Sequence, residues 1–244
     1  MKKIILFVLA GLLAGSVFAQ DPGAAEKNAA NAAWKAKDYA AAFTNFEKYL
    51  QAVNFADKAY IYNAAVAASK INNYLAAEKY FEMAIKNNYK IANSYLGKAK
   101  AEEDLNKESE MVETLENGLK AAPGNAKLET MYGAYLLKKG VEAQKNNNLT
   151  QAAESYSKIL NLTNKDLKTK AYMALGSLYF NNGASILQKA TPYANTEKER
   201  YAGEKAKADA DFKKALGYVE QAKALDPQNA DVAELMKQIK AAIK

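Results

Sequence analysis

The densest group of ionisable side chains lies in the stretch AEEDLNKESE, Ala101 to Glu110. Paired carboxylates can serve as general acid and general base, so this is the first place to look for chemistry. The spacing, however, makes these acids neighbours along a helix rather than partners across a cleft, and no EF-hand calcium loop is present. The stretch therefore predicts a solvated acidic face, and a hydrolase that uses carboxylates within Glu102 to Glu110 is kept as the alternative.

The sequence contains no histidine and no cysteine. Their absence excludes Ser-His-Asp triads, cysteine nucleophiles and the common ligand sets for zinc, haem attachment and iron–sulfur clusters. Carboxylate catalysis or a Ser–Lys pair remains possible. Because residues 20–244 also lack a glycine-rich phosphate loop, we expect a protein that is not an enzyme and that needs no cofactor or metal.

Sixteen tyrosines and one tryptophan raise the possibility of sugar binding, since aromatic rings can stack on sugar rings. Most of these tyrosines fall at spacings typical of a helical core. Tyr62, Tyr193 and Trp34 are the aromatic residues that we expect to be most exposed. A glycan-associated binding module of the periplasm or cell surface is therefore the alternative function.

The elements that must position these residues follow from an internal repeat of about 34 residues. The first two copies of its second half match at a separation of 35 residues: Tyr39, Ala42, Phe46 and Leu50 with Tyr74, Ala77, Phe81 and Ile85. The same frame continues in three later sets: Met111, Leu115, Leu119 and Pro123; Leu149, Ala152, Tyr156 and Leu160; Phe212, Ala215, Val219, Ala222 and Pro227. With abundant Ala, Lys, Glu and Leu, the frame predicts an all-α array of helix pairs.

This pattern resembles the tetratricopeptide (TPR) repeat family, and the first helix of that repeat is matched best by AYMALGSLY, Ala171 to Tyr179. Earlier first helices have small residues where two helices must approach closely: Ala30, Ala65, Ala99 and Gly140. The chain looks most like secreted TPR proteins of Bacteroidetes-type bacteria, several of which have a long hairpin before an LDP ending. The resemblance implies a right-handed superhelix of about five antiparallel pairs whose concave face binds a protein or peptide.

The TPR frame also implies which first-helix residues line the concave groove: Lys27, Asn31, Trp34, Tyr62, Asn63, Val66, Leu96 and Lys100. Some family members hold a peptide's terminal carboxylate with residues of this kind. Lys27, Asn31 and Asn63 match three of those roles, whereas Asn93 and Gly97 stand where two basic residues are expected. Lys100 is the alternative source of that charge.

The third unit departs from the pattern, because Glu102 and Glu108 stand at positions that are usually apolar. We expect this unit to be the loosest joint of the array; alternatively, its register is one turn off.

Two places break the period. From Leu119 to Gly140 the frame predicts a separation of 14 residues and the separation is 21, a surplus of two helical turns that predicts one long helix over 128–145. From Tyr179 to Phe212 it predicts a separation of 6 residues and the separation is 33. We expect both arms of the last hairpin to be lengthened, with a tip at Thr191 to Asn195 and a capping box at Thr196 and Glu199. A short separate helix is the alternative.

The N-terminus has the form of a secretory signal peptide, with Lys2 and Lys3 before an apolar run and a small-residue cleavage box at Val17 to Ala19. We expect export to the periplasm or beyond, with cleavage near Ala19-Gln20. The expected organisation is a signal peptide, 1–19, and one TPR domain, 20–244, with units at about 23–57, 58–91, 92–125, 126–165 and 166–228 and a capping helix at 229–244. The net charge of +7 is spread along the chain, which does not favour nucleic acid as a partner.

Overall fold

The computed structural model describes residues 22–243, which form eleven α-helices and one short 3-10 helix and, within that range, no strand. The predicted signal peptide lies outside the described residues. The helices are α1 (Ala24–Lys35), α2 (Tyr39–Ala52), α3 (Lys58–Lys70), α4 (Tyr74–Lys86), α5 (Ile91–Asp104), α6 (Glu108–Ala121), α7 (Ala126–Lys145), α8 (Leu149–Ile159), α9 (Lys165–Ala190), η1 (Thr191–Tyr193), α10 (Lys198–Leu225) and α11 (Ala230–Ala242). This confirms the all-α prediction.

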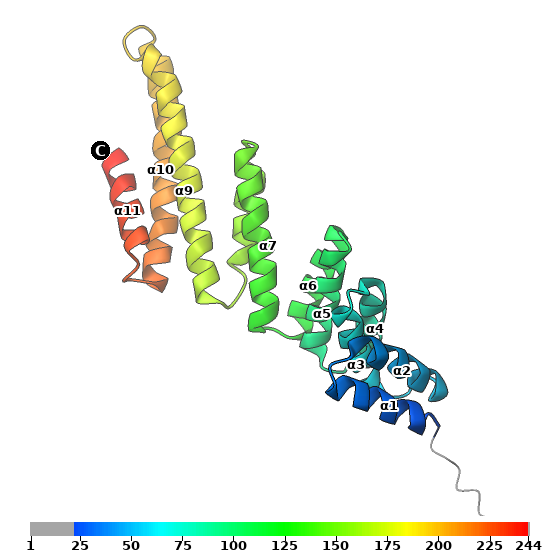
Figure 1. The fold of residues 1–244 in the computed structure, drawn as a ribbon. Coiled ribbons are helices and arrows are strands. Elements are labelled where there is room, and N and C mark those ends of the chain that lie inside the picture. The colour runs from blue at the N-terminus through cyan, green and yellow to red at the C-terminus, as the bar shows by residue number, and fades with distance from the viewer. Residues whose placement is uncertain (1–21, 244) are drawn as a thin grey trace, which may run out of the picture.

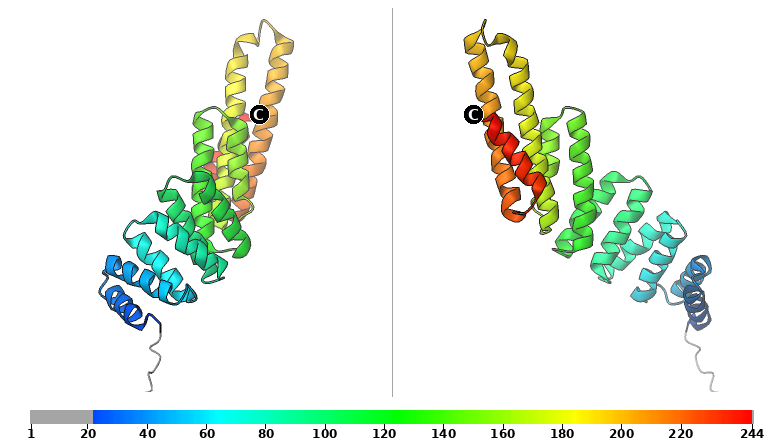
Figure 2. Two further views of the ribbon diagram at one scale, coloured as in Figure 1. Left: turned by 90° about the vertical axis from the view of Figure 1, so that its right-hand side faces the viewer. Right: turned by 60° about the vertical axis from the view of Figure 1, so that its left-hand side comes forward.

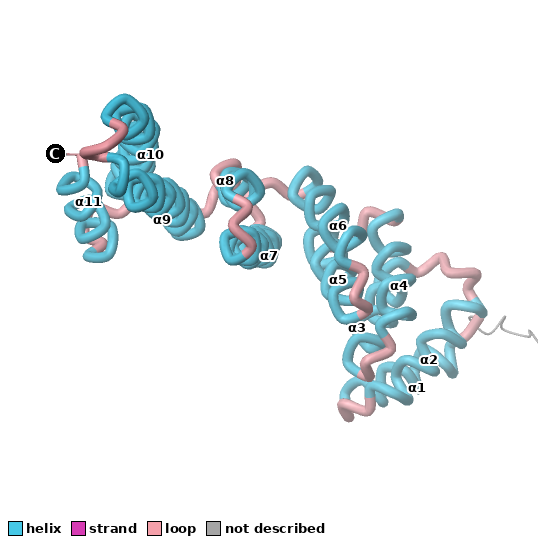
Figure 3. The backbone as a smooth tube through the Cα atoms, turned by 90° about the horizontal axis from the view of Figure 1, so that it is seen from above, coloured by secondary structure: helices cyan, strands magenta, loops and turns pink. Residues whose placement is uncertain are grey.

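The helices pack as five consecutive antiparallel hairpins, α1–α2 to α9–α10, with α11 against the last pair (Figure 1). Each pair contacts the next one along the chain, so the molecule is an elongated stack rather than a globule. The helix axes turn along the stack: in Figure 3, α1 to α6 are seen mostly from the side, whereas α7 to α10 are seen nearly end-on.

In the first four hairpins, the turn is built from a residue with positive φ followed by the N-cap of the second helix. Asn72 (φ 58°) precedes the cap Asn73, and Asn147 (φ 55°) precedes Asn148. Asparagine tolerates the left-handed region better than most residues, and an Asn side chain satisfies a free amide of the first turn. The pairs Asn72-Asn73 and Asn147-Asn148 therefore end one helix and start the next.

Small residues let the paired helices approach closely, as the repeat predicts. Ala30, Ala65 and Ala99 are fully buried. At Gly140, a Cβ atom would lie 2.2 Å from the ring of Tyr156, so only glycine fits there. Gly176 similarly faces Val219, where a Cβ would lie 2.4 Å from a methyl carbon.

The core is a chain of clusters that follow the stack. The first cluster runs from Ala30 in α1 to Ala101 in α5, and the second begins with Ala99 in the same helix. Helix α5 therefore belongs to both. Among consecutive helices, α6 and α7 share the smallest contact, whereas α5 and α6 pack as closely as α3 and α4. The least extensive contact therefore lies at the junction of the third and fourth pairs, and the looseness of the third unit stays a prediction.

The last hairpin is lengthened in both arms, as predicted. Helix α9 spans 26 residues and α10 spans 28, and residues 180–189 are helical throughout. Figure 2 shows these two arms projecting beyond α7 and α11. Gly183 makes the close pairing possible, because a Cβ there would lie 2.8 Å from the Phe212 ring. Helix α7 likewise continues without a break over the predicted 128–145.

The predicted capping box at Thr196 and Glu199 is wrong. Helix α10 begins one residue later than the proposed box requires, so Glu197 is its N-cap and makes no side-chain capping bond, while Thr196 lies before the cap. At the start of α9, the cap is Asn164, whose Oδ1 accepts from the Leu167 amide at 3.0 Å. The preceding Thr163 instead donates its amide and hydroxyl to Glu129 of α7 at 2.8 and 2.9 Å.

Candidate functional site

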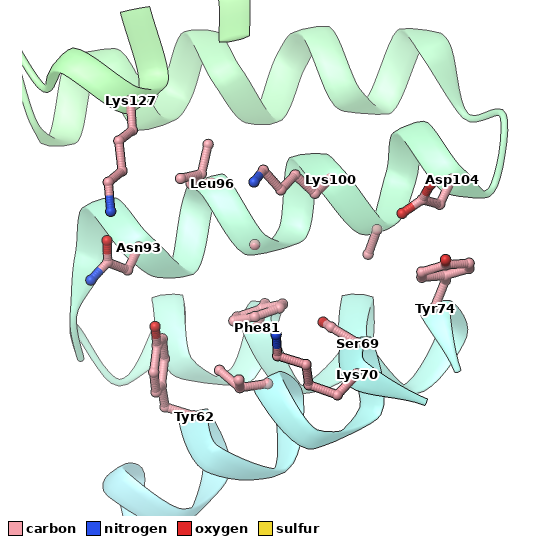
Figure 4. A pocket seen from close by; sticks show the side chains of 13 residues that line it. Tyr62, Ser69, Lys70, Tyr74, Phe81, Asn93, Leu96, Lys100, Asp104 and Lys127 are labelled. Carbon is pink, nitrogen blue, oxygen red and sulfur yellow. The ribbon is translucent and has the colours of Figure 1, made fainter. Parts of the chain in front are cut away.

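A groove of about 410 Å³ lies between α3 and α5, and we call it the α3–α5 groove. Figure 4 shows it from close by. It is formed mainly by the first helices of the second and third pairs, with contributions from α4 and from the start of α7. Its lining residues are Tyr62, Val66, Ser69, Lys70, Tyr74, Phe81, Asn93, Leu96, Gly97, Lys100, Ala101, Asp104 and Lys127.

The floor of the α3–α5 groove is apolar and depends on one glycine. The Phe81 ring lies so close to α5 that a Cβ at position 97 would be 2.3 Å from it. Tyr62 meets the edge of Phe81, with ring centroids 5.8 Å apart, and Lys90 Nζ lies 4.5 Å from the Tyr62 ring centroid. Burial raises the pKa of the Tyr62 hydroxyl, so this side chain enters the groove as a neutral phenol.

The rim of the groove is basic. Lys70, Lys100 and Lys127 line it together with one acid, Asp104, which gives three positive charges against one negative. Within residues 22–243, none of these three lysines forms an ion pair with a carboxylate. In Figure 4, Lys100 and Lys127 extend over the space beside Leu96. The groove therefore combines an apolar floor with ammonium groups that have no carboxylate partner among the described residues.

Four of the eight residues predicted for the concave face line this groove: Tyr62, Val66, Leu96 and Lys100. Lys27 and Asn31 are instead engaged inside the fold. Lys27 Nζ donates to Tyr49 Oη at 3.3 Å and lies 3.9 Å from the Asp57 carboxylate. The hydrogen bond to Tyr49 raises the pKa of Lys27.

Asn31 and Tyr60 form two hydrogen bonds, of 2.8 and 3.2 Å, that tie α1 to α3. Trp34 packs edge-on against Tyr39, with centroids 5.4 Å apart, and Asn63 is half-buried without lining the groove. The structure therefore does not bring Lys27, Asn31 and Asn63 together with Lys100 around one cavity.

Sequence reasoning missed part of the lining, namely Ser69, Lys70, Tyr74, Phe81, Ala101, Asp104 and Lys127. Lys70 and Tyr74 flank the turn between α3 and α4, and Lys127 comes from the first turn of the following pair. Asp104 could have been predicted from Lys100, because residues four apart on a helix lie on the same face. The contribution of Lys127 depends on how the pairs rotate, which spacing within one repeat does not show.

The acidic stretch does not form a uniform solvated face. Glu102 is buried, which contradicts that expectation, because it occupies a core position of the repeat between α4 and α6. Glu108 pairs with Lys139 of α7 at 2.8 Å and accepts from Tyr135 Oη, and the Lys139 ammonium lowers the pKa of its carboxyl. Asp104 lies at the α3–α5 groove.

A larger cleft of about 850 Å³ separates the α7–α8 turn from α9. Its lining is rich in amides, including Gln144, Asn147, Asn181 and Asn182, but contains no aromatic residue. Of the three aromatic residues expected to be exposed, only Tyr62 lines one of these cavities, and Tyr193 lies under the Arg200 guanidinium at 3.7 Å. The aromatic rings at these two cavities are therefore those of the α3–α5 groove, Tyr62, Tyr74 and Phe81.

The described part of the chain lacks a membrane-spanning helix and a cluster of metal ligands. None of its helices has both the length and the apolar character needed to cross a membrane. Within residues 22–243, acidic side chains do not gather in threes as metal ligands do.

The stack of helix pairs, with small residues at each crossing and a groove on the first-helix side, defines an α-helical repeat solenoid. A TPR repeats protein from Bacteroides fragilis is 43% identical to this chain, with a TM-score of 0.86 and coverage of 91% of this chain and 99% of that one. This chain belongs to the tetratricopeptide repeat family. Its fold is that of a scaffold for protein–protein interaction in general.

More distant solved structures include YrrB, described as a TPR protein with an unusual peptide-binding site, at 15% identity (88% of this chain, 92% of that chain, TM-score 0.45). Another is the TPR domain of P58(IPK), at 13% identity (91% and 65%, TM-score 0.43). No protein-family model and no curated protein matches the sequence.

Proposed function

We propose that this protein is an exported, non-enzymatic scaffold that binds a protein or peptide segment in the α3–α5 groove. The observation that supports this most directly is the combination of an apolar floor, Phe81 and Leu96, with three lysines that form no ion pair with a carboxylate within residues 22–243. Buried apolar contacts supply affinity, and unpaired charges at the rim select the partner. The chemistry favours an acidic segment that carries at least one bulky apolar side chain.

Replacing Lys100 by Glu tests this proposal at the rim. It reverses one charge without touching the core, since Lys100 is exposed. We expect recovery of the partner from a cell-envelope extract to fall, with affinity for the recovered segment reduced about tenfold or more. Lys120→Glu makes the same charge change at an exposed site on α6 outside the groove, and recovery should be unchanged. Equal recovery by wild type and Lys100→Glu would refute the assignment.

Asn31→Ala is a poor test of the groove, although the repeat frame suggests it. Its side chain is bonded to Tyr60, so the variant loosens α1 against α3. Leu96→Ala is better placed, because Leu96 lines the groove and lies between Lys127 and Lys100 in Figure 4. A glycan array run with wild type tests the alternative; binding to a glycan that survives both Lys100→Glu and Leu96→Ala would favour the glycan-associated module.

Export rests on the sequence of residues 1–19. The test is to express the full chain in bacteria, fractionate the cells and measure the mass of the product. We expect a periplasmic or secreted chain that begins at Gln20. A full-length chain retained in the cytoplasm would contradict this part of the proposal without affecting the groove.

A further inference from the structure

A second cavity, of about 310 Å³, lies on the other side of α5 from the α3–α5 groove, and we call it the acidic cavity. Helices α4, α5 and α6 form its walls. On α5, Leu96 and Lys100 face the groove, whereas Lys98 and Glu102 face the acidic cavity. With 3.6 residues per turn, these two pairs point to opposite sides of the helix.

The acidic cavity has an excess of negative charge in a chain whose net charge is +7. Five carboxylates line it, Glu78, Glu82, Glu102, Glu110 and Glu113, against one ammonium group, that of Lys98. Lys98 Nζ is shared between Glu82 at 3.0 Å and Glu102 at 3.3 Å.

Other lysines do not remove this excess. Lys107 pairs with Glu78 at 2.7 Å, and Lys86 pairs with Glu82 at 3.3 Å. Glu110 and Glu113 have no ion-pair partner within residues 22–243. Even with both lysines counted, five negative charges face three positive ones.

Glu102 supplies an independent sign that the cavity lacks a cation. Its side chain is only 1% exposed, and although Oε1 is paired with Lys98, Oε2 has no hydrogen-bond partner among the described residues. The other fully buried glutamate, Glu129, differs: its two oxygens accept three hydrogen bonds, of 2.8 to 2.9 Å, from Thr163 and Asn164. A buried carboxylate oxygen without a donor is costly, so the orphaned Oε2 of Glu102 marks a missing donor.

We propose that the acidic cavity binds an organic cation, a guanidinium or ammonium group on an alkyl stem. The carboxylates are spread over three helices rather than gathered as metal ligands, which suits a cation with several divergent N–H donors. Ile85 and Tyr95 add an apolar wall for the stem. The cation is either the side chain of a basic peptide or a free polyamine.

Isothermal titration calorimetry at pH 7.5 and low salt tests this site with three probes: a tetra-arginine peptide, a tetra-lysine peptide and free spermidine. We expect wild type to bind at least one of them. Glu113→Gln should weaken that binding about tenfold, the loss of one charge-assisted hydrogen bond. Glu113 is exposed, so this variant leaves the core intact. Glu102→Gln should weaken it at least as much.

Glu154→Gln is the matched control, since it removes one exposed carboxylate from another second helix, α8. A Glu154→Gln effect equal to that of Glu113→Gln would overturn the proposal, because binding would then follow overall charge. Failure of all three probes would overturn it as well. Tighter binding of a peptide than of spermidine assigns the cation to a peptide side chain, and the reverse order assigns it to a free polyamine. Because Lys100→Glu tests the opposite side of α5, failure here leaves the α3–α5 groove untouched.

Discussion

Glycine at a helix crossing in this protein is a packing requirement, not a source of flexibility. Gly140 shows this clearly, because its missing side chain leaves room for the Tyr156 ring. Gly217 in α10 is the opposite case: it is exposed, and nothing lies within 4 Å of a Cβ built there.

Gly140→Ala should therefore destabilise the protein by about 1–3 kcal/mol, since the added methyl group overpacks a buried contact. Gly217→Ala should stabilise it by about 0.5–1 kcal/mol, because alanine loses less conformational entropy in a helix interior. Urea unfolding followed by circular dichroism measures both. A stabilising Gly140→Ala would contradict the close approach of α7 and α8.

The buried Glu102 should give the protein a distinct pH dependence. Burial is the main cause of its raised pKa, opposed by the Thr114 hydroxyl and the Lys98 ammonium. A carboxyl whose folded pKa exceeds its unfolded value takes up protons more readily when folded, so its contribution to stability grows as the pH falls.

Wild type should therefore gain stability relative to Glu102→Gln between neutral pH and the ordinary glutamate value of 4.5, by at most about 1.4 kcal/mol per pH unit. Glu82, whose pKa is lowered, titrates below this window and is common to both proteins. The measurement is the difference in free energy of unfolding at several pH values. A wild type that loses stability relative to Glu102→Gln on acidification would contradict the raised pKa of this buried carboxyl.

At the scale of the elements, individual side chains determine the residue at which a helix begins, and the repeat spacing does not specify it. Asn164 caps α9 through the Leu167 amide, whereas Thr196 caps nothing. Asn164→Ala should cost about 1 kcal/mol. Thr196→Ala should change the free energy of unfolding by less than about 0.5 kcal/mol. Thermal unfolding of the two variants compares them directly, and a larger effect at Thr196 would argue that α10 begins earlier than Lys198.

The lengths of the elements could be predicted from the sequence better than their ends. A surplus of two turns keeps the apolar side of α7 in register, so periodicity alone indicates a continuous helix. Cap positions depend on competition between adjacent residues. Thr163 and Asn164 are both good caps by type, and Glu129 decides between them by engaging Thr163.

The candidate site was predictable to a similar extent. Tyr62, Val66, Leu96 and Lys100 follow from the repeat frame. Lys27 and Asn31 occupy equivalent positions in the first unit, but Tyr49 and Tyr60 provide internal partners for them. The contribution of Lys127 could not be predicted from the repeat, because it depends on the rotation between successive pairs, which is a property of the whole stack.

For the whole molecule, stability should be distributed along the stack, because each pair contacts only its neighbours. Helix α11 covers Val219 and Ala222 of α10, and its own Val232 and Ile239 are buried in return.

A chain that ends after Pro227 should thus show faster amide hydrogen exchange in α9 and α10, with α3 and α4 unchanged. Exchange measured by mass spectrometry on wild type and the shortened chain tests this. Uniformly faster exchange in all helices would contradict the nearest-neighbour arrangement and indicate one cooperative unit.

Helix α5 separates the α3–α5 groove from the acidic cavity and takes part in two core clusters. Two occupants on its two sides would therefore share a single 14-residue wall. If the first occupant orders this helix and thereby raises the affinity for the second, thermodynamic linkage requires the second to raise the affinity for the first by the same factor. The concentration of the acidic segment would then influence how much cation is bound on the other side of α5, and the concentration of the cation would influence binding of the segment.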